Sequence, residues 1–295
     1  EDGSTASFTG IERLVVNGGP DGVVDGSLGN DLIDGSFVDE NLEQVDNGDG
    51  INGTSGDEDA IEAGLGDDTV YGGAADDVIN GGPSGPLLTG DETLSWIAEG
   101  DGSDESGGFT QDTGIANITV TVTEDGGLDS STISSNTQYV NGSESFSTTS
   151  GLALGGNGAA DVATLDIASD TPLTGVTFRI NDVDALGWQD VLTVNAYDAN
   201  GDPVQVTLSA AGADSVSGQT VAGANGNDSE DVAEGSVLVT IPGPATRIEV
   251  SYENGSTDEQ VIYLTDLQYT ATQSDDDVLH GDAGDDTIDG GAGDD

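Results

Sequence analysis

The chain of 295 residues contains no cysteine, no methionine and no lysine, and three arginines and one histidine are its only basic side chains. The absence of cysteine excludes disulfide bonds, thiol nucleophiles and cysteine-based zinc sites. No run of 18 apolar residues occurs, so the sequence predicts no membrane-spanning helix. The shortage of basic residues argues against nucleic acid or an anionic membrane as a direct partner.

Acidic residues dominate the charge. There are 58 of them against three arginines (Arg13, Arg179 and Arg247), which leaves a formal net charge of −55. Self-repulsion of this size destabilises a compact state unless cations neutralise it. Adaptation to salt is one interpretation, and it is compatible with metal binding. The single histidine, His280, is expected to be a solvated strand residue, and aromatic residues for a sugar cleft are few. We therefore expect no enzymatic activity.

The stretch Gly53–Gly82 repeats every nine residues. Three aspartates are nine apart, and each precedes an aliphatic residue by two positions: Asp59, Asp68 and Asp77, followed by Ile61, Val70 and Ile79. The pattern recurs at Gly26–Asp34 and at Asp277–Asp295. Glycine and aspartate are abundant, so one match would mean little, but a polar linker has no reason to hold an aliphatic residue at a fixed offset from each aspartate.

The unit resembles the G-G-x-G-x-D-x-U-x nonapeptide of the RTX (hemolysin-type calcium-binding repeat) family. The resemblance implies a parallel β-roll and a protein that Gram-negative bacteria secrete through a type I channel. Its glycines allow tight turns, and its aliphatic residues, Ile288 among them, are expected to point inward. Turns on one side lie about 4.8 Å apart, so their aspartates repel unless Ca²⁺ lies between them. We expect folding to require Ca²⁺.

Carboxylate and carbonyl oxygens are the ligands that Ca²⁺ prefers. The resemblance therefore implies several Ca²⁺ ions held by aspartate carboxylates and by glycine carbonyls. The expected carboxylate ligands are Asp31, Asp59, Asp68, Asp77, Asp277, Asp286 and Asp295. The expected glycine positions are Gly29, Gly64, Gly66, Gly72, Gly284 and Gly293.

The chain divides into three segments where its nine-residue period stops and resumes. We expect an N-terminal β-roll over residues 1–89, a β-sandwich over 90–272, and an incomplete C-terminal roll over 273–295. Within the first segment, Glu12–Val16 is expected to be a capping strand, and Phe37–Asp49 an acidic loop with Asp39, Glu40, Glu43 and Asp46. Pro83 and Pro86 are expected to close the roll, because proline donates no ladder hydrogen bond.

The middle segment reads as an all-β, jelly-roll-like sandwich without helices. Strands are predicted at ETLSWIAEG, ANITVTVTED, Val162–Ile167, Gly175–Asn181, Asp190–Tyr197, Pro203–Leu208, Ser236–Ile241, Thr246–Tyr252 and Gln260–Thr270. Asp198 to Asp202 is a hairpin signal. The stretches SWIAEGDGSDESGGF, RINDVD and VSYENG resemble a sandwich module of large secreted RTX proteins.

A second metal or ligand site is possible in the sandwich. Asp182 and Asp184 lie two apart on one strand face, and Asp190 follows a short turn beside Trp188. Asp266, in the last strand, is a further candidate for such a site. The alternative is that these are surface acids of a very acidic protein.

Two arrangements of the C-terminal repeats are open. They stack back on the N-terminal roll, or they extend towards another chain. The leading hypothesis is a secreted structural protein that self-assembles head to tail through Ca²⁺ into a filament, matrix or surface layer, with Asp286 and Asp295 at the joint. The alternative is an adhesin segment whose sandwich binds carbohydrate or a surface. A third is a part of a larger enzyme or toxin, and the start at Glu1 and the stop at Asp295 suit a piece of a longer chain.

Overall fold

The computed structural model describes residues 22–27, 29–39, 41–46, 48, 57–83, 87–125, 128–156, 162–186, 188–224, 226–254 and 260–295. The chain divides into two compact units, one of Glu1–Leu87 with Ser274–Asp295, and one of Leu88–Gln273. We call them the roll and the sandwich. The strand predicted at Glu12–Val16, and the positions of Glu40 and Pro86, lie outside the described residues. Within the described residues, no helix is long and apolar enough to cross a membrane.

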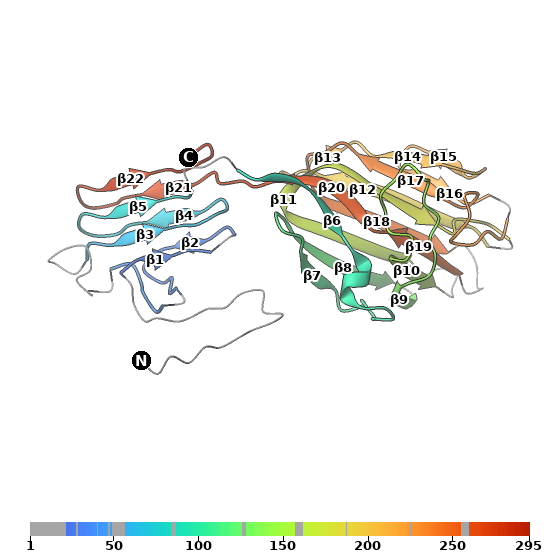
Figure 1. The fold of residues 1–295 in the computed structure, drawn as a ribbon, viewed down its shortest axis with the longest axis horizontal. Coiled ribbons are helices and arrows are strands. Elements are labelled where there is room, and N and C mark those ends of the chain that lie inside the picture. Colours follow the sequence, from blue (N-terminus) through green and yellow to red (C-terminus); the bar gives the residue numbers. More distant parts are fainter. Residues whose placement is uncertain are drawn as a thin grey trace, which may run out of the picture. The chain divides into compact units, whose positions relative to one another are not determined.

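The roll consists of two parallel sheets of two- and three-residue strands (Figure 1). Each strand pairs with the strand two repeats away, because successive repeats alternate between the two sheets. One sheet has the order β1 (Val24–Asp25), β3 (Ala60–Glu62), β5 (Val78–Asn80), β22 (Thr287–Asp289). The other has the order β2 (Leu32–Ile33), β4 (Thr69–Tyr71), β21 (Val278–His280).

The C-terminal repeats continue the N-terminal roll of the same chain. Strand β21 pairs with β4, and β22 pairs with β5, both in parallel. The chain thus adopts the first of the two open arrangements, and the sandwich is an insertion within the roll. The second arrangement, with these repeats extending away, is not the one observed, because the edges of β4 and β5 are already paired by β21 and β22.

The core of the roll is a file of aliphatic side chains between the two sheets. Ile61, Val70 and Ile79 are at most 1% exposed and pack with Val24 and Ile33. Burial of each is worth about 1.5–3 kcal/mol. Ile288 is in register with Ile79 and so lies on the inner face of its sheet, as expected, but its side chain is 46% exposed. Strand β22 is the last strand of its sheet and β21 is the last strand of the facing sheet. No further described strand of the roll therefore covers Ile288.

Hydrogen bonds link fifteen described strands in the sandwich (Figure 1). The longest, β11 (Val162–Asn181), belongs to both layers. Its first part pairs with β8 (Asn117–Asp125) and β18 (Ala245–Asn254), and its second part with β17 (Val237–Ile241) and β20 (Leu267–Thr272). The change of layer falls at a register shift between Ala168 and Leu173. Strands commonly switch sheets at such bulges.

The other sandwich elements complete the two layers around one apolar core. Strand β12 alternates buried and half-buried residues along its length, so one face meets the core. The remaining elements are β6 (Thr89–Leu94), the 3₁₀ helix η1 (Trp96–Glu99), β7 (Phe109–Asp112), β9 (Leu128–Ser134), β10 (Gly151–Gly156), β12 (Asp190–Tyr197), β13 (Pro203–Val204), β14 (Thr207–Ala210), β15 (Ser215–Ser217), β16 (Thr220–Ala222) and β19 (Gln260–Thr265).

The all-β fold predicted from the sequence is confirmed, with differences in detail. The two strands predicted at Val162–Ile167 and Gly175–Asn181 are the ends of β11. The strand predicted at Gln260–Thr270 is two strands, β19 and β20, separated at Asp266. The stretch ETLSWIAEG contains the end of β6 and then η1. The hairpin signal is correct, because the N–H of Asp198 donates to the carbonyl of Asp202 between β12 and β13.

Candidate calcium sites in the roll

The turn aspartates form two ladders along the roll. In each ladder the main-chain N–H of one aspartate donates to the carboxylate of the aspartate on the next turn of the same side, over 2.7–3.1 Å. The first ladder is Asp31, Asp68, Asp277 and Asp295. The second is Asp46, Asp59, Asp77 and Asp286. Partners are 18 residues apart where the repeats are continuous and 209 apart across the inserted sandwich.

Several ladder carboxylates keep one oxygen without a partner. In Asp68, Asp77 and Asp277, Oδ1 accepts the ladder bond, while Oδ2 is buried and receives no hydrogen bond. These residues are 1–4% exposed. An ionised carboxylate only accepts hydrogen bonds, and a buried charge without a partner costs several kcal/mol. The described residues of the roll include no lysine or arginine that could compensate this charge.

Burial also raises the pKa of these groups. It raises the pKa of Asp68 to about 7 and that of Asp77 to about 6, against the opposing effect of the N–H bonds that they accept. The like charges of Asp277 and Asp31 add to the rise at Asp68. Burial likewise raises the pKa of Asp277. The ionised ladder is therefore destabilised by itself and favours either protonation or a bound cation.

Glycines keep the space beside the carboxylates open. A Cβ on Gly72 would lie 2.7 Å from Asp77 Oδ2, and one on Gly81 would lie 2.3 Å from Asp277 Oδ2. Gly66 and Gly293, each two residues before a ladder aspartate, have φ of 113° and 122°, a conformation that other residues rarely adopt. Side chains at these positions would either strain the turn or fill the space that a bound ion needs.

The chemistry of the turns fits Ca²⁺. The buried oxygens without partners are hard ligands, and main-chain carbonyls lie beside them; the carbonyl of Gly290, for example, would be 2.4 Å from a Cβ on Gly81. Among the described residues, no three His, Cys, Asp or Glu side chains converge to hold an ion by themselves. Any ion in these turns therefore needs carbonyl as well as carboxylate ligands.

The predicted carbonyl ligands lie in the turns, as their spacing requires. Gly64 and Gly66 have positive φ in one of these turns, and Gly293 has positive φ in another. Gly72 follows β4, and its N–H donates to the carbonyl of His280. The carbonyl of Gly29 accepts a hydrogen bond from the hydroxyl of Ser27. Gly284 packs so closely on Ala75 that a Cβ would lie 1.7 Å from the Ala75 carbonyl oxygen.

The sequence pattern does not identify two aspartates of the roll: Asp46, which belongs to the second ladder, and Asp275, which belongs to neither ladder. Asp46 lies in the acidic loop, thirteen residues before Asp59, yet its N–H donates to Asp59 Oδ2 and its Oδ1 accepts the N–H of Ala74. Asp275 is fully buried, with an Oδ2 atom that lacks a partner. Neither has the nine-residue spacing of a ladder aspartate, so the period gave no signal for them.

The candidate second site in the sandwich is more fully hydrogen-bonded. Asp184 accepts bonds from Trp188 Nε1 at 2.7 Å and from the N–H of Asp228 at 2.8 Å. Asp190 accepts bonds from the N–H of Asp184 and from the hydroxyl of Tyr252. Each oxygen of these two carboxylates thus has a donor, which favours a structural role. Burial raises the pKa of Asp182 to about 8 and that of Asp190 to about 7. A ligand role for this group stays a prediction.

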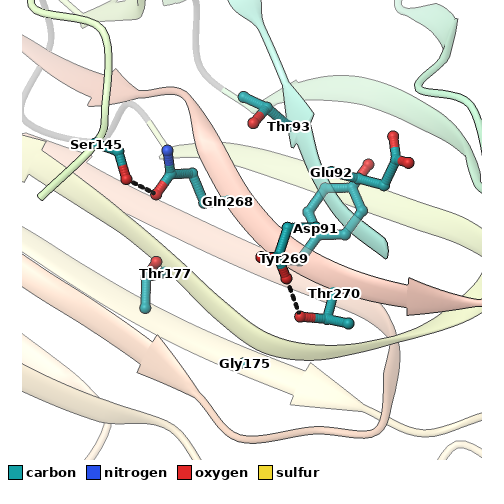
Figure 2. A pocket seen from close by; sticks show the side chains of 9 residues that line it. All are labelled: Asp91, Glu92, Thr93, Ser145, Gly175, Thr177, Gln268, Tyr269 and Thr270. Carbon is teal, nitrogen blue, oxygen red and sulfur yellow. Dashed lines mark hydrogen bonds between the residues drawn. The ribbon is translucent and has the colours of Figure 1, made fainter. Parts of the chain in front are cut away.

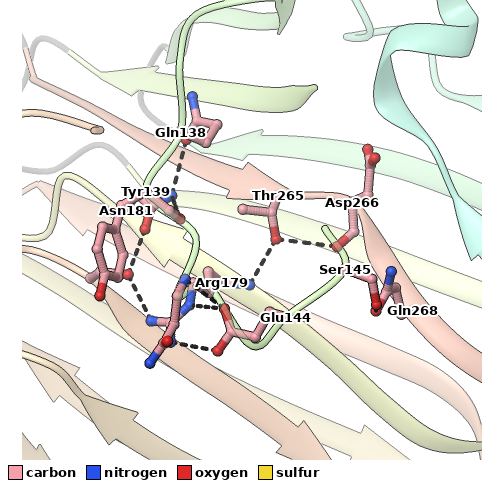
Figure 3. A network of polar contacts seen from close by, with 11 residues as sticks. Gln138, Tyr139, Glu144, Ser145, Arg179, Asn181, Thr265, Asp266 and Gln268 are labelled. Atoms are coloured by element: carbon pink, nitrogen blue, oxygen red, sulfur yellow. Dashed lines mark hydrogen bonds and ion pairs between the residues drawn. The ribbon is translucent and has the colours of Figure 1, made fainter. Parts of the chain in front are cut away.

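Asp266 belongs to a different set of contacts. Its Oδ1 accepts the N–H of Trp96 and the hydroxyl of Ser150, and burial raises its pKa. Figure 3 shows it beside a buried network centred on Arg179. The Arg179 guanidinium forms two bonds to Glu144, at 2.6 and 2.7 Å, and a third to Ser236. Asp266 shares no hydrogen-bond partner with Asp184 or Asp190.

The sandwich also carries a polar cleft of about 260 Å³ (Figure 2). Residues from β6, β11 and β20 line it, together with Ser145: Asp91, Glu92, Thr93, Gly175, Thr177, Gln268, Tyr269 and Thr270. Ser145 donates to Gln268 Oε1, and Thr270 donates to Asp91 Oδ1. The one aromatic residue of the lining, Tyr269, is 3% exposed and offers no open ring face.

The comparison with known families agrees with the ladders. The family model of the RTX calcium-binding nonapeptide repeat matches four copies, at residues 51–83 and 272–295. The chain therefore contains RTX repeats, and its cofactor is Ca²⁺. The matched segments are the two parts of the chain that pair with each other in the roll. No curated protein matches the chain.

Solved structures resemble the chain only weakly. A bacteriophage CBA120 tailspike enzymatic domain is 11% identical, covering 72% of this chain and 34% of its own, with a TM-score of 0.27. The CBM22-1 xylan-binding domain from Paenibacillus barcinonensis is 12% identical, covering 51% and 85%, with a TM-score of 0.25. An adhesin domain of Lys-gingipain from Porphyromonas gingivalis is 12% identical, covering 64% and 98%, with a TM-score of 0.24. Scores this low carry no argument about ligand or function.

Proposed function

We propose that the chain is a secreted, non-enzymatic structural protein whose roll folds around Ca²⁺. The buried Oδ2 atoms without partners, lined up along two ladders, are the observation that carries this proposal. The proposed carboxylate ligands are Asp31, Asp59, Asp68, Asp77, Asp277, Asp286 and Asp295. Carbonyls at Gly29, Gly64, Gly66, Gly72, Gly284 and Gly293 complete the sites.

The charge of the chain explains why folding depends on the ion. Neighbouring ladder carboxylates are joined through one N–H bond per turn, and no described basic side chain of the roll lies among them. Extracellular Ca²⁺ modules typically bind with dissociation constants of about 10⁻⁴–10⁻³ M. The roll is then unfolded where Ca²⁺ is scarce and folded outside the cell, which supports secretion as the proposed location.

Hydrogen exchange tests this proposal directly. Amides in residues 57–83 and 274–295 are expected to gain protection between Ca²⁺-free buffer and 10 mM Ca²⁺, while amides of β11 in the sandwich act as the internal reference. Mg²⁺ at the same concentration controls for ionic strength. Equal protection of the roll with and without Ca²⁺ would remove the proposal.

We propose that the structural role is self-assembly of the chain into polymers, and we would test this first. Strands β21 and β22 each pair with one described strand only, so their outer edges carry unpaired main-chain groups. Because Asp286 and Asp295 already bind turns of the same chain, assembly would use these edges rather than an exchanged half-roll. Electron microscopy and light scattering in 10 mM Ca²⁺ and after EGTA are expected to show reversible polymers. Monodisperse particles in Ca²⁺ would exclude this form.

The polar cleft of the sandwich favours a second candidate function, the binding of a polyhydroxylated ligand such as a carbohydrate. Hydroxyl, amide and carboxylate groups of Thr93, Thr177, Gln268 and Asp91 line it and match sugar hydroxyls. Its volume of about 260 Å³ lies just below the range of about 300–1,000 Å³ that is typical of small-molecule sites. A glycan array with the whole chain in Ca²⁺ tests it. The expected hits weaken on Gln268→Ala, whereas Gln189→Ala, outside the cleft, leaves them unchanged; no hits at all would remove this candidate.

A further inference from the structure

One turn of the roll differs from all its neighbours. The chain leaves the roll after Gly81 and Gly82 and returns at Ser274, so the inserted sandwich interrupts this turn. Two residues before the ladder aspartate, the neighbouring turns have Gly66 and Gly293, both with positive φ. The interrupted turn has Asp275 at the corresponding position, and Asp275 is not among the residues with positive φ.

The side chain of Asp275 points into the roll. The residue is fully buried, and its Oδ1 accepts the N–H of Gly66 at 3.2 Å. The N–H of Ala292 also faces the carboxylate. Its Oδ2 is buried and has no hydrogen-bond partner. A carboxylate in this state needs a positive charge, and the described residues of the roll include no lysine or arginine to supply it.

Oxygens converge on both glycines at the exit of the chain. A Cβ on Gly82 would lie 2.3 Å from Asp275 Oδ2 and 2.8 Å from the carbonyl oxygen of Gly64. A Cβ on Gly81 would lie 2.3 Å from Asp277 Oδ2, the second oxygen here without a partner. Each glycine of the departing segment thus lies against one carboxylate of the returning segment, and a side chain at either position would clash with it.

We propose that Asp275 is a Ca²⁺ ligand outside the nonapeptide pattern. Its Oδ2, with Asp277 Oδ2 and the carbonyl of Gly64, forms a site at the interrupted turn, where the carboxylate replaces the oxygen that a regular glycine turn would offer. Two carboxylates from one turn give this site more negative charge than a regular turn supplies. Ligand charge is one of the factors that tune Ca²⁺ affinity, so the site fills at lower Ca²⁺ than the others. The ion clamps the departing and returning segments together.

This inference rests on the proposed calcium-dependent roll, and the test separates the two. Calcium binding to the full chain is measured by isothermal titration calorimetry and by hydrogen exchange of residues 57–83 and 274–295. Asp275→Asn keeps the shape and an acceptor for Gly66. It is expected to weaken the tightest Ca²⁺ site about tenfold or more, while the roll still folds in 10 mM Ca²⁺. Asp294→Asn, which removes the same charge from an exposed position, is expected to titrate like the unchanged protein.

A second variant tests the inference if Asp275→Asn fails to fold. Asp275→Gly places the usual repeat residue at this position and is expected to fold in 10 mM Ca²⁺, with a site of regular affinity in place of the tightest one. If both variants titrate like the unchanged protein, Asp275 is not a ligand and the inference is overturned, although the roll still binds Ca²⁺. If the unchanged roll itself takes up no Ca²⁺, the proposed function fails as well.

Discussion

Replacement of Asp68 by asparagine is expected to shift the Ca²⁺-free and the Ca²⁺-loaded roll in opposite directions. Asp68 is 1% exposed, and burial raises its pKa from 3.8 to about 7. Holding this carboxylate ionised at pH 7.5 therefore costs the Ca²⁺-free fold roughly 4 kcal/mol. Asparagine removes that cost and keeps an acceptor for the N–H of Asp31. Its buried NH₂ group finds no acceptor, which destabilises the Ca²⁺-free fold by about 1–3 kcal/mol. A net gain of about 1–3 kcal/mol is expected without Ca²⁺.

With Ca²⁺ the same change removes a charged ligand. The midpoint of the Ca²⁺ titration is expected to rise about tenfold or more, because ligand charge sets the affinity of such sites. Hydrogen exchange of the amides in residues 57–83 reports the folding of the roll, and exchange of the amides in β11 reports the folding of the sandwich in the same sample. Urea titrations at a series of Ca²⁺ concentrations, extrapolated to zero Ca²⁺, give the free energy of the roll without the ion.

Asp67→Asn is the matched control. Asp67 is the preceding residue, it is exposed, and its Oδ1 accepts the N–H of Asp276, which an asparagine oxygen also does. Both variants lose one negative charge, so a general effect of net charge would appear in both. If Asp68→Asn lowers the stability of the Ca²⁺-free roll, or leaves the Ca²⁺ midpoint at that of Asp67→Asn, then the buried oxygen of Asp68 is not part of a calcium site.

Three further predictions concern pH, the sandwich and one strained turn. Because burial raises the pKa of Asp68 to about 7 and that of Asp77 to about 6, the Ca²⁺-free folded roll binds protons more tightly than the unfolded chain, and its stability falls as pH rises through 4 to 7. A free energy of unfolding, extrapolated to zero Ca²⁺, that is higher at pH 7.5 than at pH 5 would contradict this. Arg179→Met breaks a buried ion pair and is expected to lower the free energy of unfolding of the sandwich by about 3–5 kcal/mol. Arg247, whose side chain is 47% exposed, serves as the control, and Arg247→Met is expected to lower it by about 0–1 kcal/mol. Tryptophan fluorescence in urea measures both variants, and equal losses of stability would refute the difference. Ala75 has φ of 83°, so Ala75→Gly is expected to stabilise the Ca²⁺-loaded roll by about 1 kcal/mol, and a lower urea midpoint in Ca²⁺ would show that the turn is not strained.

The period of the sequence predicts the regular part of the roll because covalent spacing alone sets it. Nine residues complete one turn and one strand, so any two aspartates 18 apart lie on neighbouring turns of one side, as Asp59 and Asp77 do. The aliphatic residue two positions later is then buried, as in Ile61 and Ile79. Ile288 obeys the same spacing and is nevertheless exposed, because burial depends on a facing strand, which the spacing does not encode.

Long-range placement is what the sequence did not predict. Asp46 joins its ladder because the acidic loop folds back on the roll, where Asp39 accepts the N–H of Asp25 in β1. Asp275 reaches the turn of Gly66 through the return of the chain from the sandwich. The sequence predicts two strands where the structure has the single strand β11, because pairing on both sides continues the strand between them with a shift in register.

The inserted sandwich leaves the register of the roll unchanged, and its own geometry explains how. Its first and last strands, β6 and β20, pair antiparallel, and the N–H of Gln273 donates to the carbonyl of Leu88. Its two ends are therefore neighbours, and the roll accommodates the whole unit as one long turn. Deletion of residues 83–273 joins Gly82 to Ser274 and leaves GGSDDDVLH, a nine-residue unit with Asp277 in the ladder position. The shortened chain is expected to fold on Ca²⁺ addition, as measured by circular dichroism. If it stays unfolded in 10 mM Ca²⁺, the roll depends on the sandwich for more than the continuity of its turn.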